Sequence, residues 1–226
     1  MEEIVRELFR ANDHHVTARG DDLGTLQEKQ QPEVLTVSCG DSRVLQDGMW
    51  DDRPPGHIFT HSNIGNRVRQ RTESGTVVAG DVLYPLVHTG TETVLVVGHT
   101  GCGAVTAAYQ SLTDGFTDRP GIEHCVRLLE DDLAEAVDSL PGDIAEENAV
   151  NRLVEYNVDR QIEHLCDSAD VPEAVTAVGV VYDFHDVYSD KRGGAHLVNV
   201  DGQRGESALA AQYPELAERI RRLWVY

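Results

Sequence analysis

The sequence predicts an α/β protein with a mostly parallel central sheet of about four core strands, flanked by helices. Short runs of β-branched and other apolar residues, bounded by glycine or proline, are typical of strands that a parallel sheet buries on both faces. The longer segments between these runs place apolar residues at the helical period, and alternating strands and helices build parallel sheets. The predicted strands are residues 34–39, 58–61, 93–98 and 175–182.

The first 20 residues are predicted to form an N-terminal arm that is helical from residue 2. Its apolar residues share one stripe, and the polar run at 18–22 ends the helix. A stripe so exposed at a chain terminus needs a second surface to cover it. With no internal repeat in its 226 residues, the chain otherwise fits a single domain, 1–226. The stripe consists of Ile4, Val5, Leu8 and Phe9.

The remaining elements follow in order along the chain. Pro32 favours extended geometry in the residue before it, which suits the entrance to the strand at 34–39. Residues 46–56 contain Asp-Gly and Pro-Pro turn signals and lead into the strand at 58–61. The periodicity predicts helices over 75–90, after Gly103, over 122–137, over 144–167 and over 206–224, and an irregular strand or hairpin over 183–202.

Two of the predicted strands end in residues that can bind a transition metal. The first strand ends in Cys39, and the third is followed by His99 and Cys102. Open α/β sheets place their ligand sites at the carboxyl ends of their strands, so these three side chains can meet there. Two cysteines and one histidine are the ligands of a catalytic zinc that keeps its fourth position open. The spacing alone is also compatible with two buried cysteines and an unrelated histidine.

The chain start and the cysteine content favour a cytoplasmic protein. The start, Met-Glu-Glu-Ile, carries acid where a secretory signal needs base, and no run approaches the ~18 apolar residues of a membrane span. Cysteines in the cytoplasm are more often thiols or metal ligands than disulfides. Cys125 and Cys166 lie on helical apolar faces and are interpreted as core residues.

The charge is strongly negative. The chain has 39 acidic and 19 basic residues, a net charge of −20, and Lys29 and Lys191 are its only lysines. This charge disfavours nucleic acid and anionic membranes as partners. Many carboxylates with almost no lysine favour a halophilic protein that stays soluble in strong salt, where the Debye length is about 3 Å at 1 M.

Three motifs, in order and at similar intervals, resemble the signature of the β-class carbonic anhydrases. They are CGDSR at 39–43, NIGN at 63–66 and GHTGCGA at 98–104, and the resemblance extends from about Gln30 to the strand near Tyr182. The resemblance implies zinc-dependent, reversible hydration of CO2 to bicarbonate and a proton by attack of zinc-bound hydroxide. The ligand chemistry agrees, because Zn2+ lowers the pKa of bound water toward about 7.

Asp41 and Arg43 follow Cys39 at two-residue intervals and can pair on the turn after the strand. A bidentate arginine would hold the carboxylate in one orientation and keep it ionised. In the functional interpretation, Asp41 accepts the proton of the hydroxide. The alternative is a structural ion pair that caps the loop. The resemblance further implies that this aspartate can swing onto the metal and close the site.

The resemblance also implies a CO2 pocket at the interface of a homo-oligomer, either a dimer or a tetramer of dimers. The N-terminal arm would pack across the dimer partner. A CO2 pocket should be mostly apolar with few polar groups. Ordinary core packing is the alternative interpretation of its apolar residues. The amide of Gln30 is more specific, because a polar group has no partner in a purely apolar wall. The implied lining residues are Gln30, Phe59, Ile64, Tyr84 and Gly103.

The sequence departs from one branch of the family that closes its site when bicarbonate binds a second pocket. That pocket uses a tryptophan three residues before the first zinc cysteine and an arginine just before the second motif. Here these positions are Thr36 and Ser62. Without the arginine the anion loses a charge-assisted contact. We therefore expect the site to stay open, with Asp41 held on Arg43.

Two other functions are compatible with the same ligands. One is a hydrolase of the same fold that acts on carbon disulfide or carbonyl sulfide, although no residue marks a specialised tunnel. The other is a non-catalytic binding or sensing protein with a structural zinc. A closed structural site needs four protein ligands. Asp41 is the nearby candidate for the fourth, and Arg43 competes for it.

The charge generates a testable prediction about salt. We expect the melting temperature to rise between low and molar potassium chloride, because self-repulsion among the carboxylates destabilises the compact state when it is unscreened. Thermal unfolding followed by circular dichroism at increasing salt measures this. A melting temperature that is flat or falls over that range would contradict the prediction.

Overall fold

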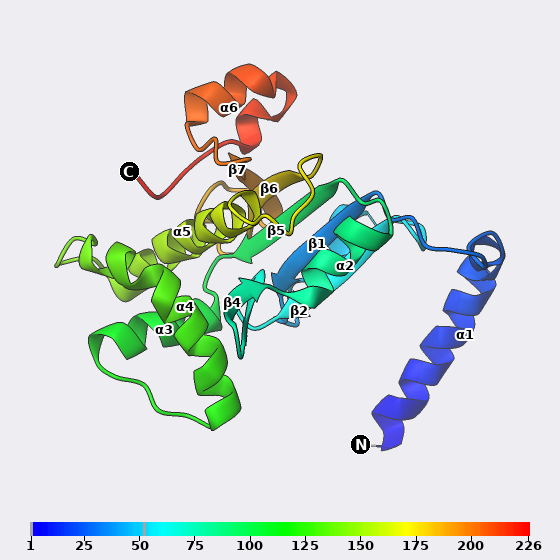
Figure 1. Ribbon diagram of the computed structural model, residues 1–226. Helices are drawn as coiled ribbons and strands as arrows, with labels where there is room; N and C mark the ends of the chain where they lie inside the picture. The colour runs from blue at the N-terminus through cyan, green and yellow to red at the C-terminus, as the bar shows by residue number, and fades with distance from the viewer. Residues whose placement is uncertain (1, 52) are drawn as a thin grey trace.

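A five-stranded sheet forms the centre of the computed structural model, which describes residues 2–51 and 53–226 (Figure 1). The strand order is β2-β1-β5-β6-β7. The first four of these strands are parallel, whereas β7 is antiparallel to β6. The predicted parallel core is confirmed, and the segment predicted as an irregular hairpin supplies the edge strand. The strands are β1 (Val34–Cys39), β2 (Ile58–Asn63), β5 (Thr93–His99), β6 (Thr176–Asp183) and β7 (Gly194–Val200).

The register brings the carboxyl ends of the central strands together. Cys39 at the end of β1 is paired with Asn63 at the end of β2. On its other side β1 pairs with β5, which ends at His99. His99 in turn lies opposite Tyr182 of β6. Three of the strand ends therefore present cysteine, asparagine and histidine at one edge of the sheet.

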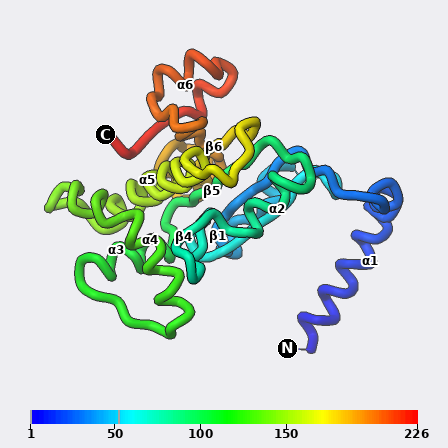
Figure 2. The backbone as a smooth tube through the Cα atoms, in the orientation of Figure 1, coloured from blue at the N-terminus to red at the C-terminus, as the bar shows by residue number. Residues whose placement is uncertain are grey.

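Helices cover the sheet and join its strands (Figures 1 and 2). Helix α5 packs directly on β5 and β6, and α2 packs on β1 and β2. Glycines allow α5 to approach the sheet closely: a Cβ at Gly98 or at Gly179 would lie 2.6 Å from a methyl group of Val158. The bounds of these two helices are α2 (Gly80–His88) and α5 (Glu146–Cys166), whereas α3 (Gly103–Thr113) and α4 (Pro120–Asp138) pack on each other and on α5.

Helix α1 (Glu2–Gly24) extends away from the rest of the chain (Figure 2). It has no buried residue, and Phe9 of the apolar stripe is 71% exposed. The predicted helical arm is confirmed, although it ends at Gly24 rather than at residue 20. Its packing on a dimer partner stays a prediction. Among the described helices, none combines the length and the apolar character needed to cross a membrane.

Residues 75–78 are not helical, which corrects the helix predicted over 75–90. They form β4 (Gly75–Val78), which pairs antiparallel with β3 (Arg69–Thr72) in a separate hairpin. Gly75 has φ +126°, a conformation that favours glycine in a tight turn. Helix α2 begins only at Gly80, because the β-branched residues before it suit the ladder.

The C-terminal helix is also shorter than predicted. Helix α6 (Glu206–Gln212) ends before Pro214, which cannot continue a helix and favours extended geometry in the residue before it. A 3-10 helix, η2 (Pro214–Arg219), follows, and a second short one, η1 (Gly48–Trp50), lies between β1 and β2. Cys166 is exposed at the end of α5, so its interpretation as a core residue is wrong.

Beyond η2 the chain binds to α5 through two buried carboxylates. Glu155 accepts the backbone N–H groups of Leu223 and Trp224 at 2.8 and 3.0 Å. Arg222 forms ion pairs with Asp159 at 2.5 Å and with Glu155 at 2.9 Å. Both carboxylates are fully buried, so they need these donors and this cation.

Asp183 at the end of β6 organises the loop that follows it. Its buried carboxylate accepts the N–H groups of Tyr188 at 2.7 Å and of His185 and Val187 at 3.1 Å each. Burial alone would raise the pKa of Asp183, but the backbone N–H groups outweigh it and hold the pKa below its usual value. The loop at 183–189 is thereby fixed against the end of the sheet.

We expect Asp183→Asn to lower the free energy of unfolding by about 2–3 kcal/mol at pH 7, because an amide oxygen accepts these bonds less strongly. The native pKa is below the unfolded value of about 3.9, so the stabilisation is complete above that value and is lost as the pH falls through the native pKa. Urea titrations between pH 7 and pH 3 measure the difference.

The exposed Asp186 in the same loop provides the control, since Asp186→Asn should change stability by less than about 0.5 kcal/mol. A difference between wild type and Asp183→Asn that stays constant down to pH 3 would contradict the assigned pKa direction.

Candidate metal centre

Cys39, His99 and Cys102 bring one ligand atom each to within 4.8 Å of one another, and all three residues are buried. Their elements are the ends of β1 and β5 and the N-cap of α3. The two sulfur atoms are 3.8 Å apart. Gly101, at φ +62°, allows the chain to turn between the histidine and the second cysteine. The predicted cluster is therefore present.

The tautomer of His99 leaves one ring nitrogen available to bind a metal. Its Nδ1 lies 3.0 Å from the carbonyl oxygen of Thr100, which can only accept, so Nδ1 carries the proton and Nε2 presents its lone pair. Nε2 is buried and has no hydrogen-bond partner among the described residues. An unpaired buried nitrogen is unfavourable unless something binds it. With two sulfurs beside it, the donor set fits Zn2+.

The two cysteines share one proton unequally, so that Cys39 is polarised toward the thiolate form and Cys102 keeps its proton. Without a metal, Cys102 donates to Cys39, and this bond lowers the pKa of Cys39. The same bond, together with burial, raises the pKa of Cys102, although N–H groups in the first turn of α3 counteract the rise. A metal that binds both sulfurs must displace the remaining proton.

Asp41 and Arg43 form the predicted pair beside this cluster. Arg43 Nε lies 2.9 Å from Asp41 Oδ1 and Nη2 lies 2.7 Å from Oδ2, and the backbone N–H of Arg43 also donates to Oδ1 at 2.9 Å. The hydrogen bonds from Arg43 hold the pKa of Asp41 well below its usual range. Asp41 Oδ2 is 3.9 Å from His99 Nε2, so an ionised oxygen lies at the metal centre.

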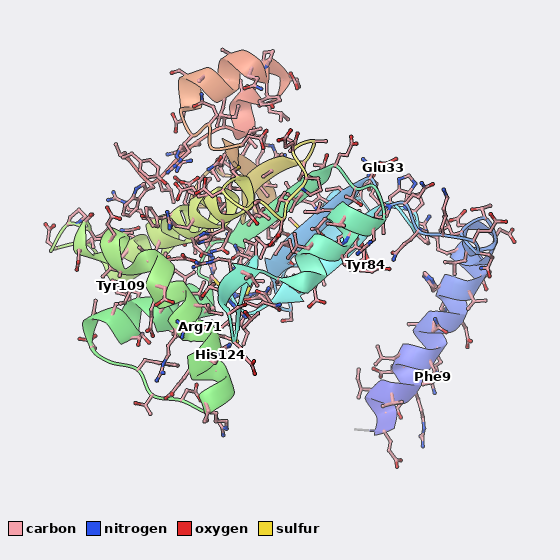
Figure 3. All side chains as sticks on the ribbon, viewed as in Figure 1. Phe9, Glu33, Arg71, Tyr84, Tyr109 and His124 are labelled. Carbon is pink, nitrogen blue, oxygen red and sulfur yellow. The ribbon has the colours of Figure 1, made fainter. Side chains whose placement is uncertain are left out.

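The predicted pocket residues are only partly brought together. The rings of Phe59 and Tyr84 lie 6.4 Å apart, and Figure 3 shows Tyr84 on α2. Tyr84 and Ile64 are 50% and 41% exposed, which is more than ordinary core packing allows. Gly103 begins α3 directly after Cys102. Gln30 is exposed in the segment between α1 and β1, and the described contacts do not join it to the metal centre.

Phe184 was not predicted from the sequence, yet its ring packs against the centre. It is stacked on the His99 imidazole, with ring centroids 5.4 Å apart and an interplanar angle of 21°. The guanidinium of Arg43 lies over the same ring, 4.4 Å from its centroid. The available signal was its place directly after β6, because the other site residues also follow parallel strands.

Comparison with known proteins identifies the family. The sequence pattern of the family described as carbonic anhydrase matches residues 34–189, which include the metal cluster and the Asp41–Arg43 pair. The chain belongs to the carbonic anhydrase family. Its relatives include a carbonic anhydrase of Pseudomonas aeruginosa that is 28% identical over 221 residues, covering 96% of this chain and 94% of the relative.

Solved structures show that the fold is that of the β-class. A β-carbonic anhydrase of Aspergillus fumigatus superposes with a TM-score of 0.71 at 24% identity, covering 95% of this chain and 97% of the other. A tetrameric β-carbonic anhydrase of Sordaria macrospora gives the same TM-score at 21% identity, with 88% and 96% covered. This carbonic anhydrase therefore has the β-class fold around a cluster that fits zinc.

We expect Cys39→Ser and Cys102→Ser to purify without stoichiometric zinc, because a hydroxyl replaces a thiolate ligand in each. Partial unfolding should accompany the loss, since the metal contributes to folding. Elemental analysis of the purified chains measures zinc per chain. Cys166→Ser, which changes an exposed cysteine, should keep one zinc per chain. Full occupancy in both of the first two variants would contradict the assignment.

Proposed function

We propose that this carbonic anhydrase catalyses the reversible, zinc-dependent hydration of CO2 to bicarbonate and a proton. The observation that carries the proposal is the unpartnered Nε2 of His99, which lies near the two cysteine sulfurs and 3.9 Å from the clamped carboxylate of Asp41. When bound, Zn2+ supplies a Lewis acid that makes water a nucleophile near neutral pH. Side chains of the protein would carry out the remaining parts of the reaction.

Asp41 would orient the attacking water. Its Oδ1 already accepts two N–H groups of Arg43, whereas Oδ2 accepts one. Oδ2 is also the oxygen nearest to His99 Nε2, so it has a lone pair available on the side of the metal centre. The low pKa of Asp41 keeps this oxygen an acceptor rather than a donor at neutral pH. Arg43 would keep the carboxylate off the metal and hold the site open.

A second copy of the chain would complete the substrate pocket. Tyr84 and Ile64 are exposed in the single chain, as is the apolar stripe of α1. Covering these surfaces in a dimer would exclude water from the reaction site, and a relative with this fold is tetrameric. We propose that Gln30, Phe59, Ile64, Tyr84 and Gly103 line the CO2 pocket, some of them contributed by the partner chain.

The proposed working environment follows from the charge and the ligands. A zinc site with two thiolates requires reduced cysteines, which supports a cytoplasmic enzyme. The net charge of −20 supports a cytoplasm of high ionic strength. A structural zinc is less well supported, because the fourth ligand would have to be Asp41, which Arg43 already binds through both oxygens.

Stopped-flow measurement of CO2 hydration in molar potassium chloride tests the function directly. The rate should exceed that of buffer, fall to the buffer rate after zinc is chelated, and return when zinc is added back. Absence of hydration by the fully zinc-loaded protein would refute the proposed reaction.

We expect Asp41→Ala and Arg43→Ala to keep zinc and lose about a hundredfold or more in kcat/KM, because the acceptor for the water is lost or mispositioned. Stopped-flow rates combined with zinc analysis measure both properties. The exposed pair Asp186–Arg192 gives matched controls, and Asp186→Ala and Arg192→Ala should stay fully active. An active Asp41→Ala enzyme would return the Asp41–Arg43 pair to a structural role.

A further inference from the structure

Phe184 lies between the metal ligand His99 and the arginine that holds Asp41. Its ring is stacked on the His99 imidazole at 5.4 Å, and the Arg43 guanidinium carbon lies 4.4 Å from its centroid. An aromatic face attracts a cation through its quadrupole, and a guanidinium plane suits this geometry. The ring thus connects the ligand to the clamp of the catalytic carboxylate.

The surroundings of Phe184 fix its ring. Its backbone N–H donates to Thr100 Oγ1 at 3.3 Å. The residue before it, Asp183, holds the loop through the N–H groups described above. The ring also packs edge-on against Tyr182, with centroids 5.8 Å apart, and against His185 at 4.6 Å. The ring of Phe184 is therefore held in place by its neighbours, whereas the Arg43 side chain that stacks on it is largely exposed.

Arg43 depends on that ring for its position. Its side chain is 54% exposed, so water competes for its two guanidinium hydrogen bonds to Asp41. Among the described residues, the contacts of its guanidinium are with Asp41 and with the ring of Phe184. Without the ring, the guanidinium can swing into solvent, which leaves Asp41 Oδ2 free and Oδ1 bound only to the backbone N–H of Arg43.

We propose that Phe184 is a positioning residue that keeps Arg43 on Asp41 and so keeps the fourth metal position free for an external ligand. Asp41 Oδ2 is 3.9 Å from His99 Nε2, so a released carboxylate lies close enough to compete for that position. This inference rests on the proposed metal site and on the roles proposed for Asp41 and Arg43. It adds Phe184 as the residue that decides whether Asp41 stays bound to Arg43 or competes for the metal.

The test measures ligand binding rather than CO2 turnover. The protein is loaded with Co2+, which accepts the same ligands as Zn2+ and has visible absorption, and it is titrated with azide as a small anion. Phe184→Leu and Phe184→Met remove the aromatic face, and each should weaken azide binding by about three- to tenfold. Phe184→Tyr keeps the face and should bind azide as the wild type does.

Two further variants separate competition by Asp41 from general damage. Phe116→Leu changes a partly buried phenylalanine that packs on the core from the segment between α3 and α4, so it should leave azide affinity unchanged. The double variant Phe184→Leu with Asp41→Asn should recover the affinity lost by Phe184→Leu, because the competing carboxylate is gone.

The outcomes are distinguishable. Folded, Co2+-loaded Phe184→Leu or Phe184→Met with wild-type azide affinity would overturn the inference. A loss that the double variant does not recover would show that Phe184 supports the site in a merely structural way. A wild type that binds no Co2+ would overturn the proposed metal site and this inference with it, whereas a loaded protein that hydrates no CO2 would refute only the proposed reaction.

Discussion

The parallel register of β1 and β5 is the constraint on which the rest of the structure depends. Because the two strands end side by side, a cysteine and a histidine from distant parts of the sequence meet at one edge of the sheet. The turn after β5 then brings Cys102 to the same point. A shift of one residue in this register would turn the side chains to the opposite face and separate the ligands.

The site combines a buried Cys-His-Cys cluster with an ion pair that is partly exposed to solvent. His99 and Cys102 are almost fully buried, so their positions are set by the packing of the core. Asp41 and Arg43 lie at the rim, where packing is loose and hydrogen bonds and one aromatic ring set the geometry. The geometry of the buried cluster therefore depends on the fold, whereas the geometry of the ion pair depends on a few contacts near the surface.

The sequence predicted the features that depend on local pattern. The four parallel strands and the Asp41–Arg43 pair follow from short-range signals, and the structure confirms both. The β3–β4 hairpin was missed because Val78 fits the apolar stripe of the helix predicted over 75–90 as well as it fits a strand. Phe184 was missed because its contact with Arg43 joins elements far apart in the sequence, and no periodicity marks such a contact.

The attachment of residues 222–224 to α5 has a consequence for cooperative folding. Glu155 and Asp159 lose their water when α5 packs, yet Arg222, the cation that forms ion pairs with both, lies 63 residues beyond Asp159 in the chain. Until this distant segment docks, the two carboxylates must remain hydrated or protonated. The final packing of α5 and the docking of residues 222–224 therefore form one cooperative step.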